Sequence, residues 1–392
     1  MISVAEALAR CLALAAPLGL ETLPLRAANG RVMATPAVAK LTQPPFAASA
    51  MDGYALGAEA AIGDSFTVIG EAGAGHGFAG ALTAKQATRI FTGAPLPQGA
   101  VTIAIQEDIS ATGDQITLNA AARAGDNIRP KGQDFALGDS LQPRLLRPND
   151  LALLAAMNVA KVQVRRRPIV ALIASGDELV MPGEDPGPDQ IIASNAFALA
   201  AMVEAAGGEA RMLPIARDTE ASLRAVFALS EGADLIVTVG GASVGDHDLV
   251  GKVAADLGLE RAFWKIAMRP GKPLMAGRVL GIPMLGLPGN PVSAIVCGHL
   301  FMVPMLKAML GLPDPAPQTL RATLGRDLPA NGPRSHYMRA RISTPNGTPT
   351  VTAFERQDSA LLTILTQADA LIILPPDSAA LPAGSLVDYI AI

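Results

Sequence analysis

The chain has 392 residues, of which 50% are hydrophobic, 17% are charged and 4% are aromatic, and its formal net charge is −4. This apolar fraction excludes a disordered chain, because disordered chains bury too little apolar surface to offset their conformational entropy. The mild acidity argues against duplex nucleic acid as a partner, since neutralising phosphates requires a basic surface. At roughly 100–200 residues per domain, the length predicts two to four domains.

The cysteines, the histidines and one apolar stretch argue against disulfide-linked, zinc-binding and membrane-spanning proteins. Cys11 and Cys297 form neither a disulfide framework nor a paired-cysteine metal motif, so we expect two buried thiols. The four histidines lack the spacing of zinc ligands. The apolar stretch 292–306 contains a histidine and a proline, and we interpret it as a buried core helix and not as a membrane span. We therefore expect a cytoplasmic protein with neither a membrane nor a nucleic-acid partner.

In chain order, a helix is expected at 3–17, followed by short extended pieces to residue 40. Residues 41–133 are rich in glycine and proline and predict a small, mostly β module. Its β-like runs lie at 66–70, 87–91, 101–106 and 116–118. A further helix is predicted at 148–160, capped by Asn149 or Asp150.

Residues 167–311 alternate short apolar runs with helix-length segments, which predicts a parallel-rich sheet covered by helices on both faces. The expected strands are 169–174, 210–215, 235–239, 262–267 and 283–287. The expected helices are 194–206, 219–230, 248–257 and 291–310, and Ser194 should cap the first. Residues 312–392 return to two-residue alternation, which is typical of a small β-barrel or sandwich.

Glycine, proline and charged residues collect after the expected strands of 167–311, where open α/β sheets bind their ligands. Glycine-rich turns at 240–245 and 289–290 can direct backbone N–H groups at an anion. Positive charge comes from Lys265, Arg269 and Lys272. Carboxylates suited to a bridging Mg²⁺ come from Asp177, Glu178, Asp218, Asp246 and Asp248. These residues predict a phosphate-bearing ligand, held with the help of a divalent metal by loops and charges and without an aromatic stacking platform.

Simpler interpretations remain open at this stage. Each loop taken alone could merely turn the chain, and a single carboxylate could be a solvated turn residue. By chemistry alone, the turns at 49–55 and 91–97 are better explained as structural. The sequence at 75–80 has the spacing GxGxxG, but no helix pattern follows it, so it does not predict a dinucleotide site.

Seven segments, taken together, resemble one family. SAMDGYA (49–55), FTGAPLP (91–97), IRPKGQD (128–134), ASGDEL (174–179), GGASVGDHD (240–248), FWKIAMRPGKP (263–273) and LPGNPVSA (287–294) occur in the order found in molybdopterin molybdenumtransferases. These are the MoeA-like proteins, which include the gephyrin E domain. The resemblance extends over essentially the whole chain and is weakest in the C-terminal module.

The resemblance implies an elongated homodimer of multidomain α/β subunits. Its parts would be a discontinuous N-terminal domain (1–40 and 134–166), an inserted β-rich domain (41–133), an α/β molybdopterin-binding domain (167–311) and a C-terminal β-barrel (312–392). It also implies a metal-dependent transferase reaction, in which adenylylated molybdopterin and molybdate give molybdenum cofactor and AMP with Mg²⁺. The active cleft would lie between the α/β domain of one subunit and the inserted domain of the other.

The resemblance also implies residue roles. Asp52 and Thr92 would be the catalytic contribution of the inserted domain, and Lys265 and Arg269 the basic one, although the family typically has lysine at the position of Arg269. Glu178, Asp218 and Asp248 would hold the metal and position the substrate. The substrate-binding positions would be Ser175, Gly176, Asp177, Gly240, Gly241, Ser243, Gly245, Lys272, Pro288, Gly289, Asn290 and Ser293, with a looser match at Arg339 and Ser359.

Three alternatives stay open. The chain could catalyse the preceding adenylylation of molybdopterin, whose enzymes resemble 167–311 but lack the flanking modules. It could be a dimeric scaffold that binds a partner peptide through its C-terminal region, as the gephyrin E domain does. It could also handle tungstate in place of molybdate. The upstream adenylyltransferase is a further candidate partner.

Overall fold

The computed structural model describes residues 1–240 and 249–392, so five expected site residues, Gly241, Ser243, Gly245, Asp246 and Asp248, lie outside the described residues. The chain forms two compact units. The first unit comprises Met1–Glu21, Gly30–Ala34 and Val164–Ile392, and the second unit comprises Thr22–Asn29 and Thr35–Gln163. The four domain boundaries expected from the sequence stay a prediction.

The first unit is built around a six-stranded sheet. In spatial order its strands are β16 (Glu209–Met212), β13 (Ile169–Ala174), β17 (Leu235–Val239), β21 (Ile282–Leu287), β20 (Met275–Val279) and β18 (Glu260–Trp264). The first four run parallel, whereas β20 is antiparallel to both of its neighbours. The parallel-rich sheet is therefore confirmed. β20 was not expected, and the strands predicted at 210–215 and 262–267 lie earlier in the chain, ending at Met212 and Trp264.

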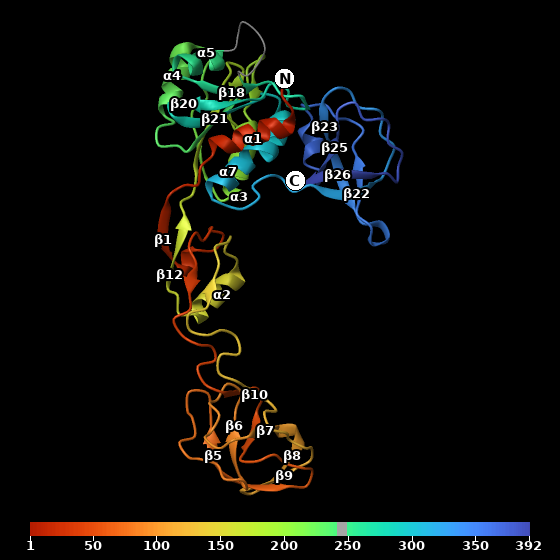
Figure 1. Ribbon diagram of the computed structural model, residues 1–392. Coiled ribbons are helices and arrows are strands. Elements are labelled where there is room, and N and C mark those ends of the chain that lie inside the picture. Colours follow the sequence, from red (N-terminus) through yellow and green to blue (C-terminus); the bar gives the residue numbers. More distant parts are fainter. Residues whose placement is uncertain (241–248) are drawn as a thin grey trace. The chain divides into compact units, whose positions relative to one another are not determined.

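Helices cover both faces of this sheet (Figure 1). On one face lie α1 (Val4–Leu14), α3 (Asn195–Ala205) and the long helical segment made of α6 (Pro291–Cys297), a π-helical turn (Gly298–Met302) and α7 (Val303–Met309). On the other face lie α4 (Glu220–Ala228) and α5 (Leu249–Asp256). Each face buries an apolar cluster against the near-continuous apolar strands β13 and β17, which explains why the strands carry no polar alternation.

Helix ends show how local sequence sets these elements. The Ser3 side chain accepts a hydrogen bond from the backbone N–H of Glu6 at 3.1 Å and so caps α1. Ser194 lies at the start of α3 but makes no capping hydrogen bond with its side chain. The expectation that it caps the helix is correct for its position and wrong for its side chain.

Among the described residues, one helical segment, Pro291–Met309, has the length and apolar composition of a membrane span. However, 72% of its most apolar window is buried inside the protein. Val292, Phe301 and Met305 belong to the same apolar cluster as α1 and α3. The expected core helix is therefore confirmed.

The C-terminal part of the first unit is a closed five-stranded barrel. Its strands are β22 (Leu320–Leu324), β23 (Ser335–Ser343), β24 (Thr350–Ala353), β25 (Ala370–Leu374) and β26 (Leu386–Ala391). The ring closes because β25 pairs with both β26 and β23. A short strand, β19 (Met268–Arg269), adds to β23 in parallel and joins the segment after β18 to the barrel. A short helix, α8 (Leu362–Leu365), precedes β25.

The second unit contains a six-stranded sheet with an apolar cluster on each face. In spatial order its strands are β7 (Thr102–Ile105), β4 (Gly53–Leu56), β6 (Gln86–Ile90), β5 (Ser65–Ala72), β9 (Gln115–Leu118) and β8 (Ile109–Thr112). Each β-like run expected in 41–133 is therefore a strand. The unit also holds α2 (Pro148–Ala156), which begins at the predicted residue 148 and ends before the predicted residue 160, whereas the predicted cap at Asn149 or Asp150 is wrong. Arg147 occupies the cap position, and Asp150 lies inside the helix, accepting a hydrogen bond from the backbone N–H of Arg147 at 2.8 Å.

Short two-stranded pairs complete the architecture. They are β1 (Leu20–Pro24) with β12 (Lys161–Arg165), β2 (Ala37–Val38) with β11 (Ser140–Leu141), β3 (Ala48–Ser49) with β10 (Ile128–Arg129), and β14 (Leu179–Val180) with β15 (Ile191–Ile192). The pair β3–β10 links two of the segments that carry the family resemblance, SAMDGYA and IRPKGQD.

Candidate functional site

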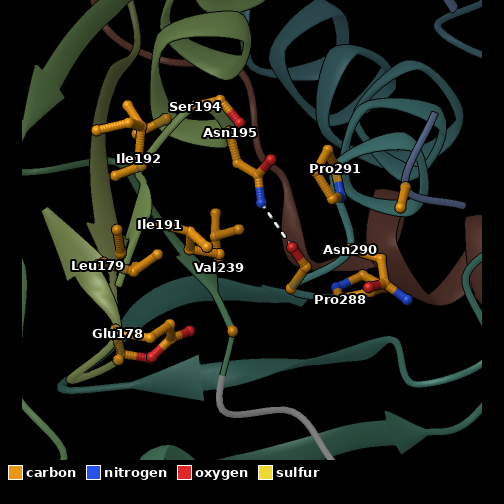
Figure 2. A pocket seen from close by; sticks show the side chains of 18 of the residues that line it. Glu178, Leu179, Ile191, Ile192, Ser194, Asn195, Val239, Pro288, Asn290 and Pro291 are labelled. Carbon is orange, nitrogen blue, oxygen red and sulfur yellow. Dashed lines mark hydrogen bonds between the residues drawn. The ribbon is translucent and has the colours of Figure 1, made fainter. Parts of the chain in front are cut away.

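A cleft of about 740 Å³ lies at one edge of the α/β sheet (Figure 2). β13, β16, β17 and β21 run parallel to one another. β20 is antiparallel to both β21 and β18, so β18 runs in the same direction as β21 and ends at the same edge. The site residues predicted from the sequence that line the cleft are Ser175, Gly176, Glu178, Asp218, Gly240, Lys272, Pro288, Gly289 and Asn290. The prediction that ligand-binding loops meet at the carboxyl ends of the strands therefore agrees with the observed geometry.

The first loop, after β13, places a carboxylate at the cleft. Gly176 has a φ of 149°, and a side chain there would overlap the carboxylate of Glu178, which folds back over it. Ser175 is 5% exposed, and within the part of the chain that the structure describes its hydroxyl has no hydrogen-bond partner. A buried polar atom without a partner is uncommon and is a frequent feature of functional sites.

The loop after β16 is hydrogen-bonded to the loop after β13. The backbone N–H of Asp218 donates to Asp177 Oδ1 at 3.1 Å, and the backbone N–H of Asp177 donates to Asp218 Oδ2 at 3.4 Å. The guanidinium of Arg217 donates to the carbonyls of Gly176, Asp177 and Leu179 at 3.4, 3.2 and 3.0 Å. Asp177 thus holds the two loops together, and Glu178 and Asp218 remain at the cleft.

The turn after β21 closes the opposite side. Asn195 Nδ2, on α3, donates to the carbonyl of Gly289 at 2.7 Å, as the dashed line in Figure 2 shows. Asn290 Nδ2 donates to Ser359 Oγ at 3.1 Å, and the carbonyl of Ser359 accepts from the backbone N–H of Val292 at 3.0 Å. Ser359, far away in the sequence, therefore lies against this turn. Gly240 and Gly289 approach so closely that a Cβ on Gly289 would be 3.6 Å from the Gly240 Cα.

The basic residues between β18 and β20 separate. Lys272 lines the cleft, whereas Lys265 and Arg269 are not among its lining residues. Lys265 has a left-handed φ of 64°, and its Nζ lies 3.9 Å from the centroid of the Trp264 ring. Arg269 faces a second cleft, of about 570 Å³, that borders the barrel. The three cations expected to act together are therefore spread over different surroundings.

The second cleft is lined by Arg269 and by the buried side chain of His336, which pairs with it across β19 and β23. Burial, together with the positive charges of Arg269, Arg339 and Arg334, lowers the pKa of His336 to about 4. Arg339 is only 1% exposed, and its Nη1 donates to the carbonyl of Asp358 at 2.8 Å. Arg339 therefore supports the segment that leads to Ser359 and does not line the first cleft.

Ser293 and the two cysteines are buried in the first unit. Ser293 is 4% exposed, within α6. Cys11 and Cys297 are free and buried, as expected, and burial raises the pKa of Cys11 to about 12. Across the described residues, no group of three or more histidine, cysteine, aspartate or glutamate side chains could hold a metal ion. Of the expected metal set, Glu178 and Asp218 share the cleft, and Asp248 is outside the described residues.

In the second unit, the two predicted residues meet. Asp52 Oδ1 accepts hydrogen bonds from the backbone N–H and from the hydroxyl of Thr92, both at 2.8 Å. These two bonds, and to a smaller extent the charge of Arg89, lower the pKa of Asp52 although the carboxylate is exposed. The guanidinium of Arg89 donates to the Gly53 carbonyl at 3.2 Å and lies 4.9 Å from the Tyr54 ring centroid. The turns at 49–55 and 91–97, which by chemistry alone were better explained as structural, therefore together hold the Asp52 carboxylate in place.

Three family models match the chain. They are the MoeA N-terminal region (domain I and II) over residues 2–158, a probable molybdopterin binding domain over 171–308 and the MoeA C-terminal region (domain IV) over 321–392. Molybdopterin molybdenumtransferase 2 of Mycobacterium tuberculosis is 36% identical over 380 residues, which is 93% of each chain. A molybdopterin molybdenumtransferase of Nostoc is 34% identical and covers 91% of this chain and 85% of the relative.

The chain belongs to the MoeA family. Its structure is similar to two crystal structures of the MoeA protein from Pyrococcus horikoshii, with TM-scores of 0.85 and 0.83 at 27% and 29% identity. The alignments cover 100% of this chain and 100% and 99% of those chains. The α/β multidomain fold with a C-terminal β-barrel, inferred from seven motifs, is therefore a MoeA fold.

Several residues that line the cleft of this MoeA-family chain were not anticipated. They are Leu179, Ile191, Ile192 and Asn195, and Arg217 holds the first of them through a hydrogen bond to the Leu179 carbonyl. The sequence contained a clue to the isoleucines, because an apolar pair that belongs to no predicted strand lies two residues before α3. The sequence contained no clue to the hydrogen bonds of Arg217, because the carbonyl groups that accept them lie some 40 positions earlier in the chain.

Proposed function

We propose that this protein inserts molybdenum into adenylylated molybdopterin, with release of AMP, in molybdenum cofactor biosynthesis. One observation carries the proposal. In a chain that matches the MoeA family from end to end, a single cleft combines glycine turns, a cation and two carboxylates at the carboxyl edge of the sheet. That combination suits a ligand with phosphate groups, and no protein nucleophile is required.

The chain's own groups would divide the work. Gly240 and Gly289 allow backbone N–H groups to approach phosphate oxygens closely, and Lys272 adds positive charge at the same cleft. Asn195 and Ser359 hold the 288–291 turn in place through hydrogen bonds, so the turn needs little rearrangement on binding. We assign molybdate, an oxyanion, to the positive charge of Lys272 at this cleft, and the catalytic roles expected of Lys265 and Arg269 stay predictions.

Glu178 and Asp218 would hold Mg²⁺. Mg²⁺ is usually bound through one or two carboxylates, with substrate phosphates and water completing its shell, and these two carboxylates at one cleft fit that preference. When bound, Mg²⁺ offsets the negative charge on the leaving phosphate. Asp248, directly before α5, is proposed as a third acidic contributor.

We further propose a cytoplasmic homodimer, in which Asp52 and Thr92 of one subunit serve the cleft of the other. The proposal rests on the family resemblance and on the preparation of Asp52 by two hydrogen bonds from Thr92. The adenylyltransferase that makes the substrate is the proposed upstream partner. Co-expressing Asp52→Asn chains with Glu178→Gln chains tests the arrangement, because about half of all dimers would be mixed and each mixed dimer would have one intact site of its two. We expect recovery to about a quarter of wild-type activity, and no recovery would contradict it.

The reaction is tested by incubating the protein with adenylylated molybdopterin, Mg²⁺ and molybdate and following AMP. We expect molybdate-dependent AMP release without ATP consumption, and Asp248→Ala should abolish it while leaving the fold intact. ATP consumption with unmodified molybdopterin would instead identify an adenylyltransferase. Wild-type turnover by Asp248→Ala would contradict the assignment of that residue.

A further inference from the structure

One wall of the cleft is apolar. Leu179, Ile191 and Ile192 line it, and Ile191 and Ile192 are 59% and 38% exposed. Isoleucine is among the side chains most often buried, so two exposed ones at a cleft are unusual. In Figure 2 these side chains lie on one side of the view, and Pro288, Asn290 and Pro291 lie on the other. An apolar lining with a few fixed polar groups is the usual composition of a small-molecule site.

The apolar wall is held in place by the same loops that position Glu178. Leu179 and Ile191 are register partners in the parallel pair β14–β15, so their side chains share a face. The backbone N–H of Ile191 donates to the carbonyl of Glu178 at 2.7 Å, and that of Ala193 donates to the carbonyl of Val180 at 2.9 Å. Arg217 fixes the other end through the Leu179 carbonyl. The wall is therefore attached to the sheet edge.

Polar groups border this wall on the remaining sides. Lys272 and the glycines of the two turns offer charge and close backbone approach to a phosphate. The Asn195 amide is oriented by its bond to Gly289, and its Oδ1 has no hydrogen-bond partner among residues 1–240 and 249–392. A ligand that fits both parts has a flat, apolar-faced heterocycle and an attached phosphate.

We propose that Leu179 and Ile191, which share a face of the β14–β15 pair, bind the face of a planar nitrogen heterocycle of the substrate, and that Ile192 adds apolar lining beside them. This inference rests on the proposed function, because that substrate carries two such rings, the pterin and the adenine. It also changes the expectation from the sequence, in which loops and charges alone held the ligand. The face of the ring packs against aliphatic side chains, so no aromatic platform is needed.

The test measures binding without turnover. The full-length double variant Ile191→Ser/Ile192→Ser is titrated, in the absence of molybdate, with two probes: molybdopterin, which lacks adenine, and AMP, which lacks pterin. Losing even one methylene contact in an apolar pocket changes discrimination roughly 10–200-fold. We therefore expect Kd to rise at least about tenfold for one probe or for both, and the affected probe identifies the ring.

Leu229→Ser is the matched control, because Leu229 is 51% exposed at the end of α4 and is not a lining residue of the cleft. It should leave both Kd values unchanged. If the double variant fails to fold, the single Ile191→Thr variant repeats the titration with a smaller change. Unchanged affinity for both probes in a folded variant would overturn the inference. If the wild-type protein binds the probes but the double variant does not, and the wild-type protein releases no AMP from the full substrate, the proposed function is contradicted while the inference about the apolar wall stands.

Discussion

The sheet edge of the first unit and the Asp52–Thr92 turn of the second unit use acidic residues in opposite ways. At the sheet edge, Glu178 and Asp218 line a cleft of about 740 Å³ that combines glycine turns and an apolar wall. In the second unit, Asp52 is exposed and already accepts two hydrogen bonds on Oδ1. The first region can surround a ligand, whereas the second presents one carboxylate held ready in its charged form. The ligand-sized cleft and the carboxylate with the lowered pKa therefore belong to different units of the chain.

The largest effect should come from the cleft. Glu178→Gln keeps the shape of the side chain but removes its charge, and we expect AMP release to fall roughly 10²–10³-fold, the size found when one electrostatic contact in an active site is removed. Glu184→Gln is the control, since Glu184 accepts from the Met181 N–H at 2.9 Å and does not line the cleft. Equal losses in both variants would contradict the distinction.

A buried histidine in the first unit should contribute to the loss of stability at low pH. The folded pKa of His336, about 4, lies below its ordinary value of 6.5, so the unfolded chain takes up the proton first. The stabilisation is complete above pH 6.5 and is lost as pH falls towards 4. It amounts to on the order of 3 kcal/mol. In His336→Gln, denaturant unfolding should show a flatter pH dependence across this window, and an unchanged slope would contradict the assignment.

Matched glycine substitutions compare the backbone of the two regions. Gly176 and Gly93 both have positive φ, of 149° and 82°. Alanine should destabilise either site by about 1–3 kcal/mol, measured by unfolding. At Gly93 the added Cβ meets nothing within 4 Å, whereas at Gly176 it displaces the Glu178 carboxylate. In Gly176→Ala, AMP release should therefore fall by more than the loss of stability explains, whereas in Gly93→Ala it should not. The same loss of AMP release in both variants would refute this.

The smallest effect is expected at the exposed pair. The Thr92 backbone N–H lowers the pKa of Asp52 most, and the Thr92 hydroxyl adds to it. Thr92→Ala should therefore raise the Asp52 pKa only part of the way to its ordinary value, while Thr92→Ser preserves it. Since a lowered carboxyl pKa stabilises the fold above the ordinary value and the benefit disappears as pH falls, Thr92→Ala should lose it at a higher pH. Carboxyl NMR titration measures the shift, and no shift would contradict the hydroxyl's role.

Elements with strong local patterns were predictable. β13 and β17 coincide with their predicted ranges because near-continuous apolar runs leave little choice of register. β20 was missed because its sequence, MAGRV, contains Gly277, which sits where a side chain would overlap the backbone of Glu260. The cap of α2 was predicted at the wrong residue because Asp150 accepts its hydrogen bond from the Arg147 N–H while lying inside the helix.

The candidate site divides in the same way. The glycine-rich and acidic loops could be located from sequence, since turn chemistry and strand ends are local properties. The partners of those loops could not. Ser359 reaches Asn290 only through the fold, and Arg217 meets the carbonyl of Leu179 only because β16 lies beside β13.

By itself, the sequence determined the order of the elements, the family and the loops that carry chemistry, because periodicity and turn preferences act over a few residues. Only the tertiary structure decided which side chains share a cleft. Arg269 and Lys272 are three positions apart, yet β19 pairs with the barrel strand β23 and takes Arg269 to a different cleft from Lys272. Side-chain direction depends on such long-range pairing, and no local pattern encodes it.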